Sequence, residues 1–287
     1  MSAVAAAPLR CGAVNTQSRF ATDTAVVAGA AGRYAARVDA GWWIVAGPNG
    51  GYIAAIVANA CRAAVDATAA GRPLRSLTVH YLRPPQEGEV DVEVAVERSG
   101  RSVTTARATM SQGGRTLVLA LASYGEPRDC VGFDDRGARS LVAPERFALP
   151  ERPEGSIIPL TDRWDMIPVV GAPPVPPPEG VVAPEPSSTV GGWLRLADPH
   201  PVDEAVLAAM CDAWWPPIFS RLPGMTLAVP TIDLTVHIER LPDDRDDWVY
   251  GEFASPRAAD GFLLEDAVLW DRRGRVLARA RQLALVA

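Results

Sequence analysis

The chain has 287 residues, of which 48% are hydrophobic and 22% charged, so its composition is that of a folded globular protein rather than a disordered one. Its 28 cationic and 34 acidic residues give a net charge of −6, which argues against nucleic acid as the main partner, because phosphate binding needs a cationic face. The four cysteines lie far apart without a Cys-x-x-Cys pair, and with three histidines they predict no metal site.

The N-terminal segment, residues 1–9, lacks the cationic start and the long apolar core of a signal peptide. The chain also has no 18-residue apolar run that is free of helix breakers, so we expect no membrane span. These features predict a cytoplasmic protein whose thiols are reduced.

The first half predicts the start of a sheet, one long helix and a meander of strands. Strands at 34–38 and 41–43 are expected to begin the sheet, and the helix covers 49–67. Period-two alternation and turn residues then predict further strands at 76–84, 90–97, 102–110 and 115–124. This half is therefore a helix followed by an antiparallel meander.

A proline-rich connector is expected between the halves. The run Ala-Pro-Pro-Val-Pro-Pro-Pro at 172–178 cannot form a helix or a central strand. We therefore predict a first domain over 1–126, a connector with the start of the second sheet over 127–190, and a second domain over 191–287. Residues 164–166 and 192–195 are expected to begin that second sheet.

The second half repeats the first. A helix is predicted over 201–215, and strands over 233–240, 248–254, 262–270 and 275–286. The segment Ser-Leu-Thr-Val-His-Tyr-Leu-Arg-Pro at 76–84 recurs as Asp-Leu-Thr-Val-His-Ile-Glu-Arg at 233–240, and 233 − 76 is an offset of 157. An internal repeat of this length indicates two copies of one structural unit.

In each copy, an Ala- and Ile-rich helix must bury its apolar side against the apolar face of the meander. That arrangement, duplicated, resembles the double hotdog fold. The motifs Gly-Pro-Asn-Gly-Gly-Tyr at 47–52, Tyr-Leu-Arg-Pro at 81–84, Arg-Ser at 101–102 and Thr-Ile-Asp at 231–233, with Gln282, resemble those of TesB-like acyl-CoA thioesterases. The resemblance implies an α+β fold with two tandem helix-wrapped antiparallel sheets that form a pseudo-dimer.

The same resemblance implies cofactor-free hydrolysis of an acyl-CoA substrate to a carboxylic acid and coenzyme A. The water-activating triad of that family would be Asp233, Ser255 and Gln282 here. Asp233 replaces Ser76 of the first copy, and Gln282 stands opposite Ala122, so both polar groups are specific to the second copy. Ser255 precedes Pro256 and is equally well explained as a turn residue.

Gly50 and Gly51 at the helix start are expected to offer backbone N–H groups to the thioester oxygen, because helix N-termini favour negative charge. They also fit a simple helix-entry turn with Asn49 as the N-cap, and the two interpretations are compatible. The glycine pair occurs only in the first copy and the carboxylate and amide only in the second. The halves therefore predict one active site per chain.

Two alternatives accompany this interpretation. His80 and His237 are duplicated, so we expect them to make the same structural hydrogen bond twice rather than to act as bases. An enoyl-thioester hydratase would need a histidine with an acidic partner, which the sequence does not offer. A non-catalytic acyl-binding protein would keep the fold without turnover, and a homo-oligomer is compatible with any of these functions.

Overall fold

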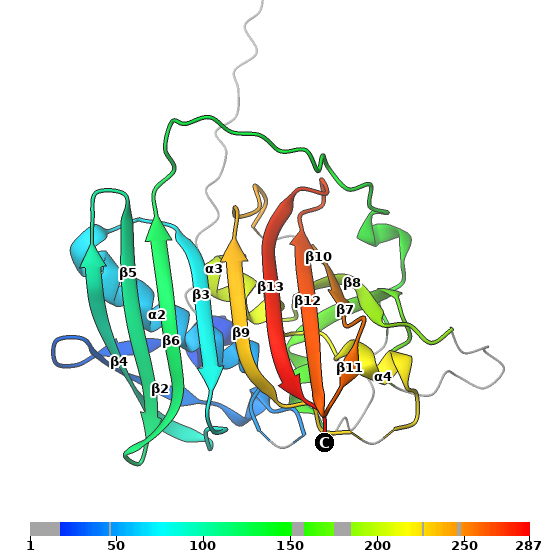
Figure 1. Cartoon of the computed structure of the whole chain (residues 1–287), viewed down its shortest axis with the longest axis horizontal. Coiled ribbons are helices and arrows are strands. Elements are labelled where there is room, and N and C mark those ends of the chain that lie inside the picture. The colour runs from blue at the N-terminus through cyan, green and yellow to red at the C-terminus, as the bar shows by residue number, and fades with distance from the viewer. Residues whose placement is uncertain (1–17, 46, 151–157, 175–184, 226, 246–247) are drawn as a thin grey trace, which may run out of the picture.

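The computed structural model describes residues 18–287, except for 46, 151–157, 175–184, 226 and 246–247. Within them, 13 strands form one antiparallel sheet in the order β1-β2-β4-β5-β6-β3-β9-β13-β12-β10-β8-β7, with β11 paired to β12 (Figure 1). The strands of the first half are β1 (Val26–Ala28), β2 (Arg33–Val38), β3 (Leu74–Tyr81), β4 (Gly88–Ser99), β5 (Val103–Gln112) and β6 (Arg115–Gly125). Those of the second half are β7 (Trp164–Val170), β8 (Thr189–Leu196), β9 (Thr231–Ile238), β10 (Val249–Ala254), β11 (Ala258–Ala259), β12 (Phe262–Trp270) and β13 (Val276–Leu285).

The two halves use their strands in the same order. Counted outward from the centre, β3-β6-β5-β4-β2-β1 mirrors β9-β13-β12-β10-β8-β7. The central strands β3 and β9 pair antiparallel, and Thr78 lies opposite Thr235 with their hydroxyl oxygens 3.1 Å apart. These two residues are equivalent in the repeat, so a pseudo-two-fold axis passes between them. The predicted continuous sheet between the halves is confirmed.

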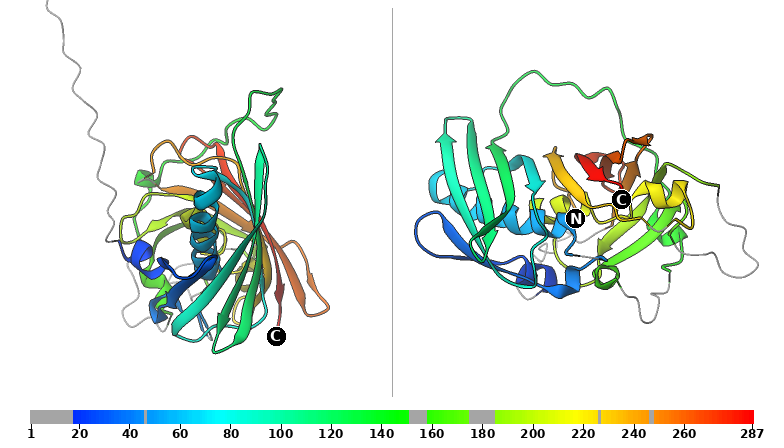
Figure 2. Two further views of the ribbon diagram at one scale, coloured as in Figure 1. Left: turned by 90° about the vertical axis from the view of Figure 1, so that its left-hand side faces the viewer. Right: turned by 60° about the horizontal axis from the view of Figure 1, so that its bottom comes forward.

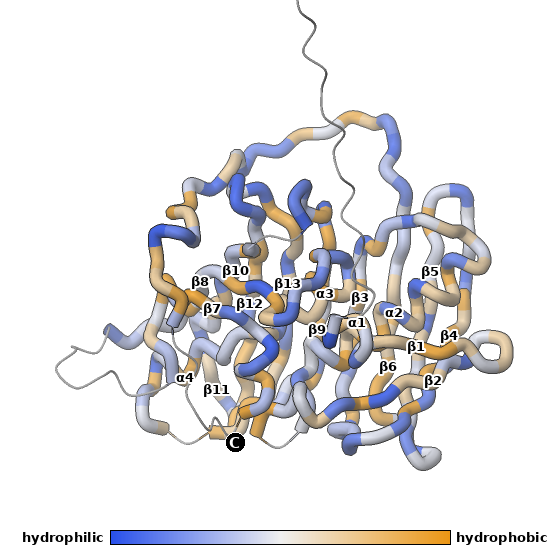
Figure 3. The backbone as a smooth tube through the Cα atoms, turned by 180° about the vertical axis from the view of Figure 1, so that it is seen from behind, coloured by the Kyte–Doolittle hydropathy of each residue, from blue (hydrophilic) through white to orange (hydrophobic). Residues whose placement is uncertain are grey.

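The helices are α1 (Arg19–Asp23), α2 (Gly50–Ala69), α3 (Glu204–Met210) and α4 (Pro217–Arg221), with 3-10 turns η1 (Ala40–Trp42), η2 (Pro144–Arg146) and η3 (Pro159–Asp162). The sheet curves around α2 (Figure 2), and α2 and α3 lie beside each other on the same face of the sheet (Figure 3). Every residue from Gly51 to Ala58 is buried. The core thus lies between the concave face of the sheet and these two helices.

Two predicted elements differ from the structure. The second helix is shorter than 201–215, because α3 covers only Glu204–Met210. A separate helix, α4, begins at Pro217, since Pro216 and Pro217 prevent one helix from running through this point. Residues 41–43 do not form a strand, since most of them belong to the turn η1. Asp39 caps this turn by accepting a hydrogen bond from the Gly41 N–H, 2.8 Å away.

The connector region contains the expected start of the second sheet. Strand β7 lies within 127–190 and pairs with β8, which begins at Thr189. Residues 175–178 of the proline run lie outside the described part of the chain. The boundaries at 126 and 190 stay a prediction. No helix in the described ranges is long and apolar enough to cross a membrane.

Candidate active site

The first turn of α2 packs closely against the end of α3. A Cβ atom on Gly51 would lie 2.5 Å from the backbone oxygen of Ala209, and one on Gly50 would lie 2.9 Å from a carboxylate oxygen of Asp212. Only glycine allows this approach, since real Cβ contacts are longer. The glycine pair therefore brings the end of one half's helix onto the first turn of the other half's helix.

This contact has a measurable consequence for stability. We expect Gly51→Ala to lower the free energy of unfolding by about 1–3 kcal/mol, because the new methyl group meets backbone atoms that cannot rotate away. Urea unfolding measures the loss. Gly132→Ala is the control, because a Cβ there meets nothing within 4 Å. Equal stability of the two variants would contradict the tight packing.

Asp212 is the carboxylate that this packing brings to the N-terminus of α2. Its Oδ2 accepts hydrogen bonds from the Gly51 N–H at 2.8 Å and from Asn49 Nδ2 at 3.0 Å. Asn49 also donates to the backbone oxygen of Asp212 at 2.7 Å and caps α2 by accepting from the Tyr52 N–H. The carboxylate is thus held by the helix that the other half contributes.

The environment of Asp212 suits a base. Burial raises its pKa to about 6, and hydrogen bonds from the Gly51 N–H and the Gln282 side chain oppose that shift. Burial disfavours the charged form, whereas donors stabilise it. The residue keeps part of its surface open to solvent. A carboxylate of this kind is ionised at neutral pH and can still accept a proton.

Gln282 joins Asp212 to the second half's sheet. Its Oε1 accepts a hydrogen bond from Thr231 Oγ1 at 2.9 Å, and its Nε2 donates to Glu265 Oε1 at 2.8 Å. Gln282 and Glu265 are directly opposite each other on β13 and β12. Together, Asp212, Thr231, Glu265 and Gln282 form what we call the polar cluster, which can bind a water molecule and accept its proton.

A β-bulge aims Thr231 at this cluster. Leu283 pairs with Asp233 but the next residue, Ala284, pairs with Thr231, so Ile232 is the extra residue. Without the bulge, Ile232 would share the inner face with Leu234. Bulges commonly re-aim a side chain beside a functional site.

The five predicted site residues do not all lie together in the structure. Gln282, Gly50 and Gly51 all lie around Asp212. Asp233 lies elsewhere: it pairs with His80 and Leu283, whereas Gln282 pairs with Leu234, so Asp233 and Gln282 are on opposite faces of the sheet.

Asp233, which the resemblance made the catalytic carboxylate, therefore lies on the outer face, inside β9 and away from Gln282. The Gly51 N–H, expected to bind the thioester oxygen, instead donates to Asp212. Both histidines of the repeat are exposed, and neither shows the expected structural hydrogen bond among the described residues.

Ser255 follows β10 and is buried, and its Oγ has no hydrogen-bond partner in the described parts of the chain. Ala254 pairs with Asp266 in the ladder, and one further step places Ser255 opposite Glu265. It lies next to the polar cluster without a described bond to it.

Three members of the cluster were missed from the sequence, although two of them left a signal. Asp212 is the one charged residue in the apolar run 205–215, where a carboxylate needs partners. Glu265 occupies an inward position of the alternating strand 262–270. Thr231 stood in the Thr-Ile-Asp motif at 231–233, but the bulge breaks the strand alternation, so the pattern did not place it on the inner face.

The pseudo-symmetric position in the first half lacks these groups. Leu74 replaces Thr231 at the offset of 157, and Ala106 and Ala122 replace the Glu265 and Gln282 pair. There α2 and α3 meet through an ion pair between Arg62 and Glu204, with 2.9 Å between nitrogen and oxygen. The described residues therefore contain this polar cluster once.

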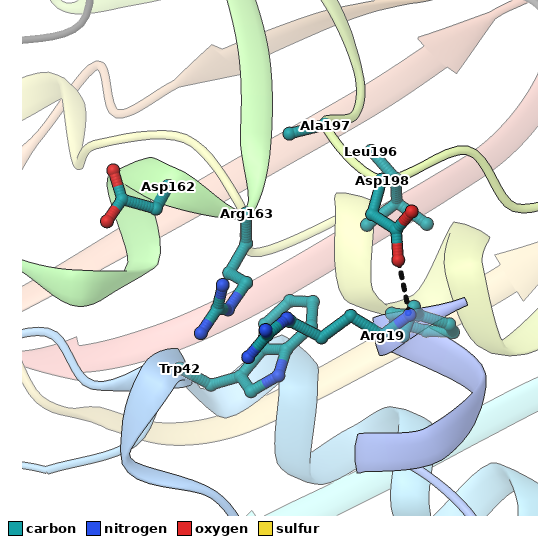
Figure 4. A pocket seen from close by; sticks show the side chains of 8 residues that line it. Arg19, Trp42, Asp162, Arg163, Leu196, Ala197 and Asp198 are labelled. Carbon is teal, nitrogen blue, oxygen red and sulfur yellow. Dashed lines mark hydrogen bonds between the residues drawn. The ribbon is translucent and has the colours of Figure 1, made fainter. Parts of the chain in front are cut away.

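A separate cavity of about 200 Å³ lies beside α1, η3 and the end of β8 (Figure 4). Arg19, Arg163 and Trp42 line it, with the Arg163 guanidinium 5.9 Å from the centre of the Trp42 ring. Asp198 accepts a hydrogen bond from the Arg19 N–H, and Asp162 is also part of the wall. The two arginines and two aspartates in its wall cancel in charge. None of its lining residues belongs to the polar cluster.

Two family models together match most of the chain. Family models described as the acyl-CoA thioesterase N-terminal domain and C-terminal domain match residues 39–125 and 138–286. An uncharacterised protein of Mycobacterium tuberculosis is 29% identical over 276 residues, covering 85% of this chain and 88% of that protein.

Two crystal structures cover nearly the whole chain. A hot dog fold protein of unknown function from Alicyclobacillus acidocaldarius has a TM-score of 0.79 at 22% identity, over 93% of this chain and 97% of that one. An acyl-CoA thioesterase II from Mycobacterium marinum has a TM-score of 0.71 at 22% identity, over 93% and 98%. With the duplicated strand order, these likenesses confirm the predicted α+β double hotdog.

Proposed function

The chain belongs to the acyl-CoA thioesterase family, as its motifs indicated, and on this premise we propose that it hydrolyses an acyl-CoA thioester to a free carboxylic acid and coenzyme A. The observation that carries the proposal is Asp212, a carboxylate held at the N-terminus of α2 with Gln282 among its donors. Hydrolysis needs a positioned water and a group to accept its proton, and this cluster offers polar side chains to hold the water and a carboxylate to accept the proton.

In the proposed reaction, Asp212 accepts a proton from the attacking water while the water oxygen forms a bond to the thioester carbonyl carbon. Gln282, held by Thr231, orients that water. The tetrahedral intermediate then expels the coenzyme A thiolate as the carbon–sulfur bond breaks, and Asp212 returns the proton to the sulfur. Asp212 and Thr231 thus take the roles that the family resemblance implied for Asp233 and Ser255, and Gly50 and Gly51 act by positioning Asp212.

The direct test is a thiol-release assay with saturated acyl-CoA substrates of increasing chain length. We expect one free thiol for each thioester cleaved, with loss of the signal in Asp212→Asn. Binding of acyl-CoA without thiol release at any chain length would instead support the non-catalytic acyl-binding protein.

The proposal also predicts how the rate depends on pH. Because the pKa of Asp212 is raised to about 6, its carboxylate is ionised above that pH and protonated below it. A base must be ionised to accept a proton, so kcat/KM should fall about tenfold per pH unit below about pH 6. Initial rates in constant-ionic-strength buffers measure the profile. A profile flat down to about pH 4 would contradict Asp212 as the base.

We also expect each chain to have one active site. The first half carries Leu74, Ala106 and Ala122 where the second carries the polar cluster. A non-hydrolysable thioether analogue of acyl-CoA should therefore titrate at about one equivalent per chain by calorimetry. Two equivalents would show that the first half's site also binds substrate.

A further inference from the structure

Glu265 is a buried carboxyl group that the proposed reaction does not use. It is 3% exposed on the inner face of β12. Gln282 Nε2 donates to its Oε1, whereas its Oε2 is buried without a hydrogen-bond partner in the described ranges. A buried carboxylate normally has a cation or several donors around it. Among the described residues, Glu265 has one hydrogen-bond donor, the neutral amide of Gln282.

The charged groups around Glu265 make its ionised form still less favourable. Asp212 lies beyond the Gln282 amide, and Asp266 is its neighbour along β12. The nearest guanidinium on β13, that of Arg281, is bonded to Asp266 on the outer face at 2.7 and 2.9 Å. Burial first, and then the charges of Asp212 and Asp266, raise the pKa of Glu265 to about 8.

We propose that Glu265 is a positioning residue of the hydrolytic site proposed above: as a neutral carboxylic acid it fixes the side-chain amide of Gln282 in the orientation that Asp212 requires. This inference rests on the proposed function. Thr231 donates to the amide oxygen and Glu265 accepts from the amide nitrogen, so both ends are held. A flipped amide would turn its oxygen toward Glu265 Oε1 and lose that bond, and it would also turn the amide nitrogen away from Glu265 toward Thr231.

The neutral state also serves the chemistry. The amide nitrogen has two hydrogens, and with one on Glu265 the other is available to Asp212, whose pKa the Gln282 bond lowers. An ionised Glu265 would place a second negative charge one amide away from Asp212. It would disfavour the anionic transition state, because like charges in a poorly solvated site repel strongly.

Ser255 lies on the same side of the sheet as the unpartnered oxygen of Glu265. The proton of the acid is on Oε2, since Oε1 accepts from Gln282. The strand register places Ser255 opposite Glu265 on the same face, and its buried Oγ has no other partner in the described parts of the chain. Ser255 Oγ and Glu265 Oε2 are thus two buried polar atoms on one face of the sheet, each without a hydrogen-bond partner among the described residues.

Kinetics of two variants test the role. Glu265→Leu removes the acceptor, and we expect kcat to fall about tenfold with KM changed less than about twofold. Glu265→Gln keeps a neutral acceptor of the same size and should recover most of that rate. Asp266→Asn removes a carboxylate from the outer face of the same strand and should leave turnover near that of the unmodified chain. Equal kcat in Glu265→Leu and the unmodified chain overturns the proposal.

The pH profile gives a readout that a purely structural role would not move. The unmodified chain should lose activity above about pH 8 as Glu265 ionises, whereas Glu265→Gln should lack that alkaline decline. Identical alkaline limbs in the two proteins would overturn the proposal.

Infrared spectroscopy decides the charge state independently of any turnover. The difference spectrum between the unmodified chain and Glu265→Gln at about pH 7 should contain the carbonyl band of a protonated carboxylic acid. Carboxylate bands there would overturn the proposal. If no acyl-CoA is hydrolysed but the acid band is present, the proposed function fails while the neutral Glu265 stands.

Discussion

Asp212→Asn lowers kcat by about 10²-fold or more, while the protein stays folded. Asparagine keeps the shape of the side chain, and its oxygen can still accept the hydrogen bond that the Gly51 N–H donates at 2.8 Å. It cannot accept a proton from water. The loss should therefore appear in kcat, because the charge is needed in the transition state and not for binding the substrate. Thiol release under saturating acyl-CoA measures it.

Asp233→Asn is the matched control, because it makes the same chemical change in the same half of the chain. Asp233 lies on the outer face of the sheet, across from His80. We expect kcat within about twofold of the unmodified chain. A large loss in Asp233→Asn together with normal turnover in Asp212→Asn would reverse our assignment of the base.

The fold could be predicted because its signals are local and repeated. Alternating apolar residues identify the strands, and the recurrence of 76–84 at 233–240 identifies the two copies. The structure pairs these very segments as β3 and β9, at the centre of one sheet. The helix entry was also recognisable, because Asn49 is a typical N-cap residue and the helix begins directly after it, at Gly50.

The base could not be found by the same reasoning. The repeat singled out Asp233 because it differs from Ser76, but a difference between copies does not say which face of the strand a residue occupies. Asp212 becomes part of the site only through the close approach of α2 and α3, which joins residues 161 positions apart. Such tertiary contacts leave no periodic pattern in the sequence. The face of Thr231 was hidden for a related reason, because the bulge at Ile232 shifts the alternation by one residue.

Gln282→Leu should lower kcat by about 10- to 100-fold, because leucine has a similar size but no amide. The change removes the donor to Asp212 and leaves Thr231 and Glu265 without their described partner. Stability should fall as well, by about 1–3 kcal/mol, since buried polar groups lose a hydrogen bond. Thiol release and urea unfolding measure the two effects. Arg281→Leu, one residue away on the outer face, is the control and should leave kcat nearly unchanged.

A double-mutant cycle with Thr231→Val shows how the effect of Gln282 arises. Valine keeps the shape of threonine and removes the hydroxyl that donates to Gln282 Oε1 at 2.9 Å. If Thr231 acts by holding that amide, Thr231→Val should lower kcat in the unmodified chain but cause little further loss in Gln282→Leu, because the group it holds is already gone. Independent contributions would instead multiply. Fully additive losses would mean that Thr231 contacts the attacking water itself, and the water would then be held by two side chains of the second half rather than by Gln282 alone.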